Sequence, residues 1–456
     1  MGTLSQEPAS IIQDLKVTLQ YSSTVFPLEK TVKRSMFLSN IDQVLNFTVE
    51  TVHFFLANPD FPPETIAGKI KSALEKVLVP YDFLAGRLRL DPHKGRLEID
   101  CNAAGVGFTM ATSEVSLDEI GDLVYPNPAF WQLAMAASDN LEPENGPLCL
   151  FQVTTFKCGS FAMGISTNHV LFDGISFKYF LDNLASLAAD KPLAVTPCNS
   201  RELLAARSPP RVTFPHPELV KFEIPSQGEG SQATKALFEP ISEDLEFQTF
   251  RLSSNHISVL KEKAKIGLNN NESTRMITSF NVVTAHVWRC RAIAGDIGEE
   301  LEKTSTLLYA VDIRSRFQPP LPPSYTGNCV LAAYARATIG ELKDASFIRL
   351  VEMVSEGAKR MTDEYARSVI DCGESSQRFP YGDLLISSWW KLGFSNVDYP
   401  WGRPKYSCPL VRHRKNIVLF FPDIEGSSFG NGVNILVALP SKEMEKFQAL
   451  FNNSTA

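Results

Sequence analysis

The chain has 456 residues, which is long for a single hydrophobic core, so two domains are expected. Hydrophobic residues make up 44% of the sequence and charged residues 21%, a balance that excludes a disordered chain and is typical of a globular protein with a large core. The formal net charge of -7 provides no overall attraction to a phosphate backbone, so we expect no nucleic-acid partner.

The first half of the chain alternates between strand and helix patterns. A helix opens at Pro62-Pro63, where proline suits the first turn, and a second helix is indicated by Phe177, Phe180 and Leu184 at helical spacing. The remaining pattern predicts strands at 15–21 and 47–56, a hairpin over 84–101 that turns at Lys94-Gly95, and a hairpin over 149–167 that turns at Gly159.

A change of composition separates the two halves. From residue 192 the chain becomes rich in proline and then in glycine, which predicts a long crossover rather than a loop within one compact domain. We therefore expect a first domain over 1–191, a linker over 192–240 and a second domain over 241–456. Patterns in the second domain predict strands at 247–252, 306–313, 416–421 and 432–439, and helices from 254, over 278–292, over 345–370 and from 441.

The spacing of the cysteines and the length of the apolar segments indicate where in the cell the protein is expected. The eight cysteines are scattered without a C-x-x-C pair, which favours reduced, mostly buried thiols over disulfides or a zinc site. No apolar run approaches the ~20 residues that span a bilayer, and neither a secretory signal nor a myristoylation signal is present at the N-terminus. We expect a soluble cytoplasmic protein with no membrane span and no bound metal.

The segment 168–174 carries the pattern that best predicts chemistry. It places the imidazole of His169 four residues before the carboxylate of Asp173, which is followed by Gly174. A strand is expected before this segment and a helix after it, so the motif lies in a loop between rigid elements, a common place for catalytic groups. Neutral imidazole, with a pKa near ~6.5, suits a general base. The alternative is a hydrogen-bonded core histidine with an aspartate nearby.

Other candidate motifs are weaker. The run GSSFG at 426–430 matches the G-x-S-x-G nucleophile elbow, but a strand is expected after it and neither Asp nor His follows Asp423, so we favour a glycine-rich hairpin over a Ser428 nucleophile. No zinc or phosphate-loop motif occurs. The other six histidines have no carboxylate or cysteine partner at motif spacing and are interpreted as structural: His53, His93, His216, His256, His286 and His413.

Taken together, several segments resemble the BAHD acyltransferases, plant enzymes that move an acyl group from coenzyme A to an alcohol or amine. The resemblance covers nearly the whole chain, in the family's order and roughly its spacing. One motif departs from the family: D-F-G-W-G reads DYPWG here, where a proline of fixed φ replaces a permissive glycine. The matching segments are LAGRL at 84–88, HVLFDG at 169–174, SF and AHVW within 279–288, VDIRSR at 311–316, GN at 327–328, ISSW at 386–389 and DYPWG at 398–402.

The resemblance implies an α/β fold of two chloramphenicol-acetyltransferase-like domains, each a mixed β-sheet with helices, joined by a long crossover loop. It implies His169 as the general base, with Asp173 turned away from the imidazole and paired with Arg314, and Gly174 allowing a close backbone turn. Ser387 and Trp389 are expected to line the substrate site.

The resemblance also bears on the DYPWG turn. We expect Asp398 to be a remote structural residue, with Trp401 and Gly402 forming the same tight turn. The alternative is that Asp398 acts as a second acid or base.

The expected reaction is transfer from acyl-CoA, a co-substrate rather than a permanently bound cofactor, to a hydroxyl of a small hydrophobic acceptor by a monomeric enzyme. Members that use shikimate or quinate carry an arginine where this chain has Gly373-Glu374-Ser375, which favours an acceptor such as a long-chain alcohol or hydroxy fatty acid, with a hydroxycinnamoyl-type donor. Two alternatives stay open: a hydroxylated terpenoid, steroid or other specialised metabolite as acceptor, and a non-catalytic accessory protein of the same fold.

Overall fold

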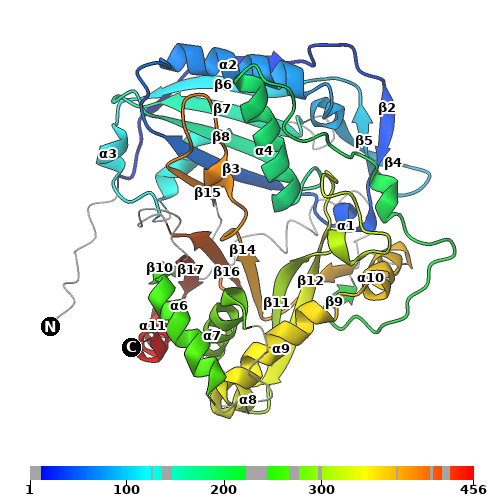
Figure 1. The fold of residues 1–456 in the computed structure, drawn as a ribbon, viewed down its shortest axis with the longest axis vertical. Coiled ribbons are helices and arrows are strands. Elements are labelled where there is room, and N and C mark those ends of the chain that lie inside the picture. Colours follow the sequence, from blue (N-terminus) through cyan, green and yellow to red (C-terminus); the bar gives the residue numbers. More distant parts are fainter. Residues whose placement is uncertain are drawn as a thin grey trace. The chain divides into compact units, whose positions relative to one another are not determined.

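The computed structural model describes residues 12–124, 127–135, 146–221, 244–266, 277–295, 300–375, 378–410, 414–423 and 432–455. The chain forms two compact units, each built around a six-stranded sheet (Figure 1). The first unit comprises residues 1–205, 322–328 and 392–411, and the second comprises 206–321, 329–391 and 412–456. The predicted α/β class with two sheet-containing units is confirmed.

The first unit is organised around a mixed sheet in the order β1-β6-β7-β8-β3-β15, in which only β6 and β7 run parallel. The helices α2 and α4 pack against each other beside this sheet (Figure 1). A small three-stranded sheet, in the order β2-β5-β4, is formed by strands that lie between β1 and β6 in the sequence. The bounds are β1 Val17–Val25, β2 Arg34–Phe37, α1 Asn40–Gln43, β3 Thr48–Phe55, α2 Pro63–Val77, β4 Arg87–Asp91, β5 Arg96–Cys101, β6 Val106–Ser113, α3 Leu117–Ile120, β7 Cys149–Thr155, β8 Phe161–Asn168, α4 Gly174–Ala188, η3 Arg201–Leu204 and β15 Tyr406–Leu410.

The second unit has a sheet in the order β10-β17-β16-β14-β11-β12, in which β14 runs parallel to both of its neighbours. The helix α7 packs against α6, α9 and α11 (Figure 1). The bounds are β9 Leu219–Lys221, β10 Glu246–Leu252, α6 Ser254–Lys265, α7 Ser279–Ala294, β11 Thr304–Asp312, η5 Arg314–Arg316, β12 Val330–Thr338, α8 Ile339–Asp344, α9 Phe347–Lys359, α10 Asp363–Ser375, β13 Arg378–Pro380, β14 Leu384–Ser388, β16 Ile417–Pro422, β17 Val433–Leu439 and α11 Ser441–Thr455.

The units are not continuous in sequence, unlike the division at 1–191 and 241–456 that we expected. Two segments of the second half, 322–328 and 392–411, fold with the first unit. In the second of these, β15 pairs antiparallel with β3 and adds an edge strand that buries Tyr406 and Ser407. Strand pairing across some 350 residues leaves no periodic signal in the sequence, which is why the expected boundaries missed it.

The predicted helix over 345–370 is wrong, because the structure has two helices there. The first ends at Lys359, and the side chain of Arg360 turns to the carbonyl oxygen of Tyr334, 3.3 Å away, and lies over the Tyr334 ring. The hydroxyl of Thr362 then accepts the backbone N–H of Tyr365 and begins α10. Both helices carry an apolar stripe, so periodicity alone did not reveal the break between them.

No helix in the described part of the chain is both long enough and apolar enough to cross a membrane. All eight cysteines are free thiols, and all except Cys158 and Cys198 are buried.

Candidate active site

The loop that carries His169 begins where β8 leaves the sheet of the first unit. The backbone N–H of His169 donates to the carbonyl oxygen of Phe47 at 2.8 Å, which continues the pairing of β8 with β3 by one residue. The side-chain oxygen of Asn168 accepts the backbone N–H of Val170 at 3.0 Å and turns the chain sharply. His169 is therefore the first residue outside the strand, and its ring lies 5.1 Å from the ring of Phe47.

His169 is partly exposed as a residue, whereas its Nδ1 atom is buried and has no hydrogen-bond partner among the described residues. Burial lowers the pKa of His169 below its usual value of 6.5, because a charged imidazolium loses hydration there. The charge of Asp173 and the side chain of Asn328 act in the opposite direction and raise that pKa. The net effect favours neutral imidazole, the form that accepts a proton.

Asp173 lies at the N-terminus of α4 and caps that helix. Its Oδ1 accepts the backbone N–H and the hydroxyl of Ser176, both at 2.9 Å, and its own backbone N–H donates to the Ser176 hydroxyl at 3.0 Å. In the part of the chain that the structure describes, no hydrogen bond joins this carboxylate to the imidazole of His169. Asp173 thus shapes the loop from its far end, by fixing the first turn of the helix.

The predicted partner of Asp173, Arg314, belongs to the second unit. Arg314 follows β11, is buried, and its Nη1 donates to Oδ1 of Asp312 at 2.9 Å. The pairing of Asp173 with Arg314 stays a prediction.

Gly174 is the first residue of α4. A Cβ at this position would lie 2.6 Å from a methyl carbon of Leu392, so close packing of that side chain favours glycine here. The φ of Gly174 is not among the positive values found in the described chain. The preference for glycine therefore comes from the Leu392 side chain beside the helix, which would have to shift for a Cβ, and not from the tight backbone turn that the sequence suggested.

A buried cluster of polar side chains binds the His169 loop through its carbonyl oxygens. The side chains of Arg201 and Asp42 form an ion pair of 3.1 Å and are both 0% exposed. The guanidinium of Arg201 donates to the carbonyl oxygens of Val170 at 3.0 Å and of Leu171 at 2.7 Å. The amide of Asn328 donates to the carbonyl oxygen of His169 and to Asp42, both at 2.8 Å.

Sequence reasoning missed Asp42 and Arg201 and included Asn328 only as part of the Gly327-Asn328 motif. Arg201 lies in the predicted crossover, where composition indicates a linker, and Asp42 lies on the four-residue helix α1. A charged residue in a short element carries no signal of burial, so neither could be found from pattern. The glycine of the motif has a steric reason: a Cβ at Gly327 would lie 2.8 Å from Cδ of Arg201.

The DYPWG segment forms a tight turn in the first unit. The backbone N–H of Gly402 donates to the carbonyl oxygen of Tyr399 at 3.0 Å, and Gly402 has a φ of 118°. Pro400 therefore occupies the second position of the turn, where its fixed φ is favourable. Trp401 is buried, and its ring lies 6.3 Å from that of Phe55. The proline that departs from the family motif is compatible with this turn.

Asp398 points away from the buried part of this turn. Its side chain is 73% exposed and pairs with Arg403 at 2.5 Å, which lowers the pKa of the Asp398 carboxyl. Among the described contacts none links Asp398 to His169. This geometry favours a structural role for Asp398 over a role as a second acid or base. The structural role stays a prediction.

Ser387 and Trp389 lie at the end of β14 in the second unit. Both side chains are half-buried, and the backbone N–H of Trp389 donates to the carbonyl oxygen of Phe420 at 2.8 Å. Their expected contact with substrate stays a prediction. The G-x-S-x-G run with Ser428 lies outside the described residues.

A second histidine has triad-like partners that the sequence pattern did not indicate. In the second unit, Nε2 of His216 lies 2.7 Å from the hydroxyl of Ser368, and Nδ1 lies 3.3 Å from the carboxylate of Glu218. The Ser368 oxygen also accepts the backbone N–H groups of Thr213 and Phe214. His216, Glu218 and Ser368 are buried, so a substrate has no access to them, and their bonds join residues 213–218 to α10.

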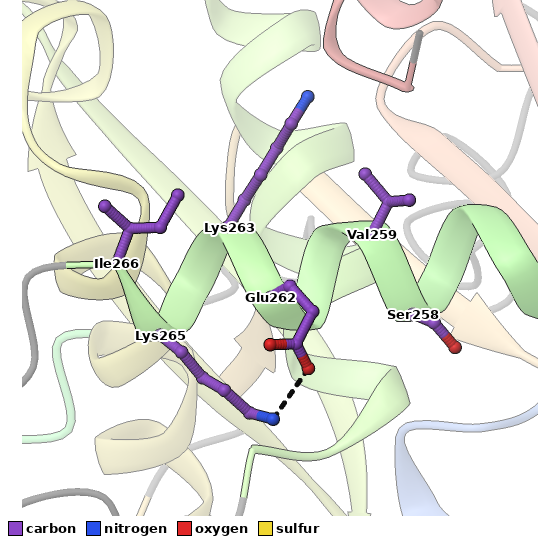
Figure 2. Close-up of a pocket in the computed structure, with 6 residues that line it drawn as sticks. All are labelled: Ser258, Val259, Glu262, Lys263, Lys265 and Ile266. Carbon is purple, nitrogen blue, oxygen red and sulfur yellow. Dashed lines mark hydrogen bonds and ion pairs between the residues drawn. The ribbon is translucent and has the colours of Figure 1, made fainter.

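Figure 2 shows a surface hollow along the outer face of α6, in the second unit. Its side chains include Glu262 and Lys265, which pair with each other at 2.7 Å. None of the residues that line it is an expected site residue or a histidine, so it offers no base for acyl transfer. The lining residues are Ser258, Val259, Glu262, Lys263, Lys265 and Ile266.

The chain matches known proteins over its full length. Residues 15–453 match the Transferase family. The chain is 57% identical to Acyltransferase GLAUCE of Arabidopsis thaliana over 460 residues, which cover 100% of each protein. It is 35% identical to Omega-hydroxypalmitate O-feruloyl transferase of the same plant over 444 residues, which cover 96% of this chain and 93% of the relative.

The fold also matches solved structures. The crystal structure of F. sporotrichioides TRI101, complexed with coenzyme A and T-2, aligns with a TM-score of 0.73 over 91% of this chain and 97% of that one. At 14% sequence identity this likeness shows a shared fold.

Proposed function

Because the chain belongs to the Transferase family and is an acyltransferase of the BAHD type, we propose that it moves an acyl group from an acyl-CoA to a hydroxyl of a small hydrophobic acceptor, with His169 as general base. The observation that carries this proposal is the state of His169. The residue is partly exposed at the end of a buried strand, its pKa is lowered by burial, and its loop is held by buried side chains.

The geometry supports Nε2 as the reacting nitrogen, because Nδ1 is buried. In the proposed reaction the acceptor oxygen attacks the thioester carbonyl carbon while its proton moves to Nε2. The tetrahedral intermediate then collapses, the carbon–sulfur bond breaks, and the imidazolium returns the proton to the thiolate of coenzyme A. The imidazole ends neutral, as it began, and acyl-CoA enters the proposed cycle as a co-substrate.

The proposed acceptor is a long-chain alcohol or hydroxy fatty acid, and the proposed donor is of the hydroxycinnamoyl type. The 35% identical relative is named for feruloyl transfer to omega-hydroxypalmitate, which supports both choices. The absence of an arginine at 373–375 agrees with an acceptor that lacks the carboxylate of shikimate or quinate. A hydroxylated terpenoid or steroid is the rival acceptor.

A competition assay tests the choice of substrates. The purified protein is given a mixture of acetyl-, feruloyl- and palmitoyl-CoA with a mixture of a long-chain alcohol, an omega-hydroxy fatty acid, a hydroxylated steroid and shikimate, and products are identified by mass. We expect the long-chain acceptors to be used first. Preference for shikimate would contradict the proposed acceptor, and preference for the steroid would support the rival.

The role of His169 is tested by substitution with a matched control. His169→Ala should lower kcat by ~10²–10⁴, the usual cost of losing a general base, without unfolding the protein. The control is His53→Ala, which removes a buried histidine of the same unit that is bonded to Ser407 at 2.9 Å. This control should lower the melting temperature and retain kcat. Wild-type turnover in folded His169→Ala would refute the assignment.

The pH profile gives a second test. A base works only while it is unprotonated, so activity is present above its pKa and is lost as the pH falls through it. Because burial lowers the pKa of His169, the acid limb of kcat/KM should lie below pH 6.5. An acid limb at or above that value would contradict the proposal.

We also propose that the protein is a monomer and that it is located in the cytoplasm. Size-exclusion chromatography with light scattering tests the oligomeric state, and a mass near 50.6 kDa is expected.

A further inference from the structure

Three consecutive carbonyl oxygens in the His169 loop are bound by side chains from distant parts of the sequence. Asn328 donates to His169, while Arg201 donates to Val170 and Leu171. Carbonyl groups of a loop between a strand and a helix lack regular backbone partners, and buried ones need a donor. Here the donors are planar side chains with fixed geometry, so they fix the orientation of three successive peptide groups.

Asp42 holds these two donors in place. Its Oδ1 lies 3.1 Å from Nη1 of Arg201 and accepts the amide Nδ2 of Asn328 at 2.8 Å. Its Oδ2 accepts the backbone N–H of Ser39 at 2.9 Å and the Ser39 hydroxyl at 2.8 Å. Both carboxylate oxygens of Asp42 are therefore used, and the carboxylate cannot rotate without breaking bonds to three other residues.

A buried ion pair is weak evidence for stability, since desolvation of both charges offsets much of their attraction. In other proteins, replacing such a pair by apolar residues of similar volume is often neutral or stabilising. Arginine and asparagine at these positions provide what an apolar pair cannot, which is a set of directed donors aimed at the loop. The arrangement is better explained by the need to orient the loop than by stability.

We propose that Asp42, Arg201 and Asn328 are positioning residues for the reaction, and that this cluster rather than Asp173 sets the orientation of the His169 imidazole. The inference rests on the proposed role of His169 as the base. Two further atoms support it: Nδ1 of His169 and Oδ1 of Asn328 are buried without partners among the described residues. Nδ1 can carry a proton and Oδ1 can accept one, and the two residues are already joined by a 2.8 Å bond.

We assign Oδ1 of Asn328 as the acceptor for a proton on Nδ1 of His169, because both atoms are buried and unpaired among the described residues. That bond would hold the proton on Nδ1 and leave the lone pair on Nε2, the nitrogen that has to accept the proton of the acceptor alcohol. In a Ser-His-Asp triad the carboxylate performs this task. Here an amide oxygen would perform it, and Asp173 is occupied with Ser176.

The main test replaces Arg201 by lysine. Lysine keeps the charge beside Asp42 but has no planar fork, so it cannot bind the Val170 and Leu171 carbonyls together. We expect kcat to fall by ~10², the effect of displacing a catalytic group by about 1 Å, with KM for the acyl donor changed less than ~3-fold. The control is Arg207→Lys, which loses a forked arginine bonded to Glu364 and Asp371 in the second unit and should lower the melting temperature only.

A double mutant separates positioning from general damage. If Arg201 acts through His169, then Arg201→Lys should cause no further loss of kcat once His169 is alanine, since residues that act as a unit are not additive. An equal ~10² loss in both backgrounds would overturn the proposal.

A readout that does not depend on catalysis completes the design. The ring-nitrogen NMR signals of His169 in the wild-type protein should show the Nδ1–H tautomer, and Asn328→Ala should shift the population towards Nε2–H. Asn183→Ala, which removes another buried amide of the first unit, should leave these signals unchanged. A wild-type tautomer in folded Asn328→Ala, or unchanged kcat in folded Arg201→Lys, would refute the inference. Full activity in His169→Ala would refute the proposed function instead, and the NMR arm would still decide the positioning.

Discussion

Replacing Asp173 by asparagine separates three roles that a carboxylate can have at this position. As a helix cap, the side chain needs only an oxygen acceptor for Ser176, which asparagine also supplies. As the partner of Arg314, it needs a negative charge, which asparagine lacks. As a triad acid, it needs a hydrogen bond to the imidazole. Asp173→Ala removes all three functions together, so the pair of variants distinguishes them.

The magnitudes follow from the contacts of each group. Loss of the cap in Asp173→Ala costs about 1 kcal/mol, within a range of about 0.5–2. Loss of the proposed ion pair costs about 3–5 kcal/mol when a charge is left buried and unpaired, and the lower end applies because Arg314 also has Asp312 at 2.9 Å. We therefore expect asparagine to cost about 3 kcal/mol and alanine about 4 kcal/mol, with lower activity in both variants.

The assay is urea unfolding monitored by tryptophan fluorescence, together with kcat measured for the same samples. The control is Ser116→Ala, which removes the cap of α3 in the same unit but no charge, and should cost about 1 kcal/mol with kcat retained. If Asp173→Asn kept full stability and full activity, Asp173 would be only a cap and the pairing with Arg314 would be wrong. Full stability with a ~10⁴-fold loss of kcat would instead show a triad acid.

Three further predictions concern packing, surface charge and acid stability. Gly327→Ala should cost about 1–3 kcal/mol in urea unfolding and lower kcat, because its Cβ would press on Tyr325 and Arg201, whereas Gly68→Ala, with no neighbour within 4 Å, should not destabilise the protein. Asp398→Asn should change stability by less than about 1 kcal/mol and leave kcat intact, because its ion pair is exposed; a tenfold loss of kcat would restore a catalytic role. Burial lowers the pKa of His53 from 6.5 to about 3, so neutral His53 contributes to the free energy of unfolding above pH 6.5. As the pH falls below 6.5 this contribution is lost, by about 2 kcal/mol at pH 5. A His53→Gln variant with the same pH dependence of urea unfolding as the wild type would contradict this.

Local patterns predicted the elements that surround the site. The hairpin of β7 and β8 and the helix α4 were expected from alternation and from helical spacing, and the structure places them at Cys149–Thr155, Phe161–Asn168 and Gly174–Ala188. The position of His169 between a strand and a helix was predicted for the same reason. These elements are specified by neighbours in sequence, so a single sequence contains the information that defines them.

The parts that were missed depend on contacts between distant residues. Pairing of β15 with β3 joins Ser407 to His53, and Asn328 reaches the carbonyl oxygen of His169 from 159 residues away. At the break between α9 and α10, Arg360 contacts Tyr334, which lies 26 residues away in sequence. None of these contacts alters the hydrophobic periodicity or the composition of the segments involved, so they could not be predicted from sequence patterns.

The two ends of the His169 loop are fixed in different ways, and the difference has a physical reason. At the helix end, the side chain of Asp173 binds its own first turn, which holds the backbone but does not reach the imidazole. At the strand end, donors from Arg201 and Asn328 bind the peptide carbonyls directly beside His169. A base has to remain partly exposed to meet its substrate, so it cannot be immobilised by packing on all sides. Under the proposed positioning role, buried donors fix the backbone of His169 and leave its side chain partly exposed.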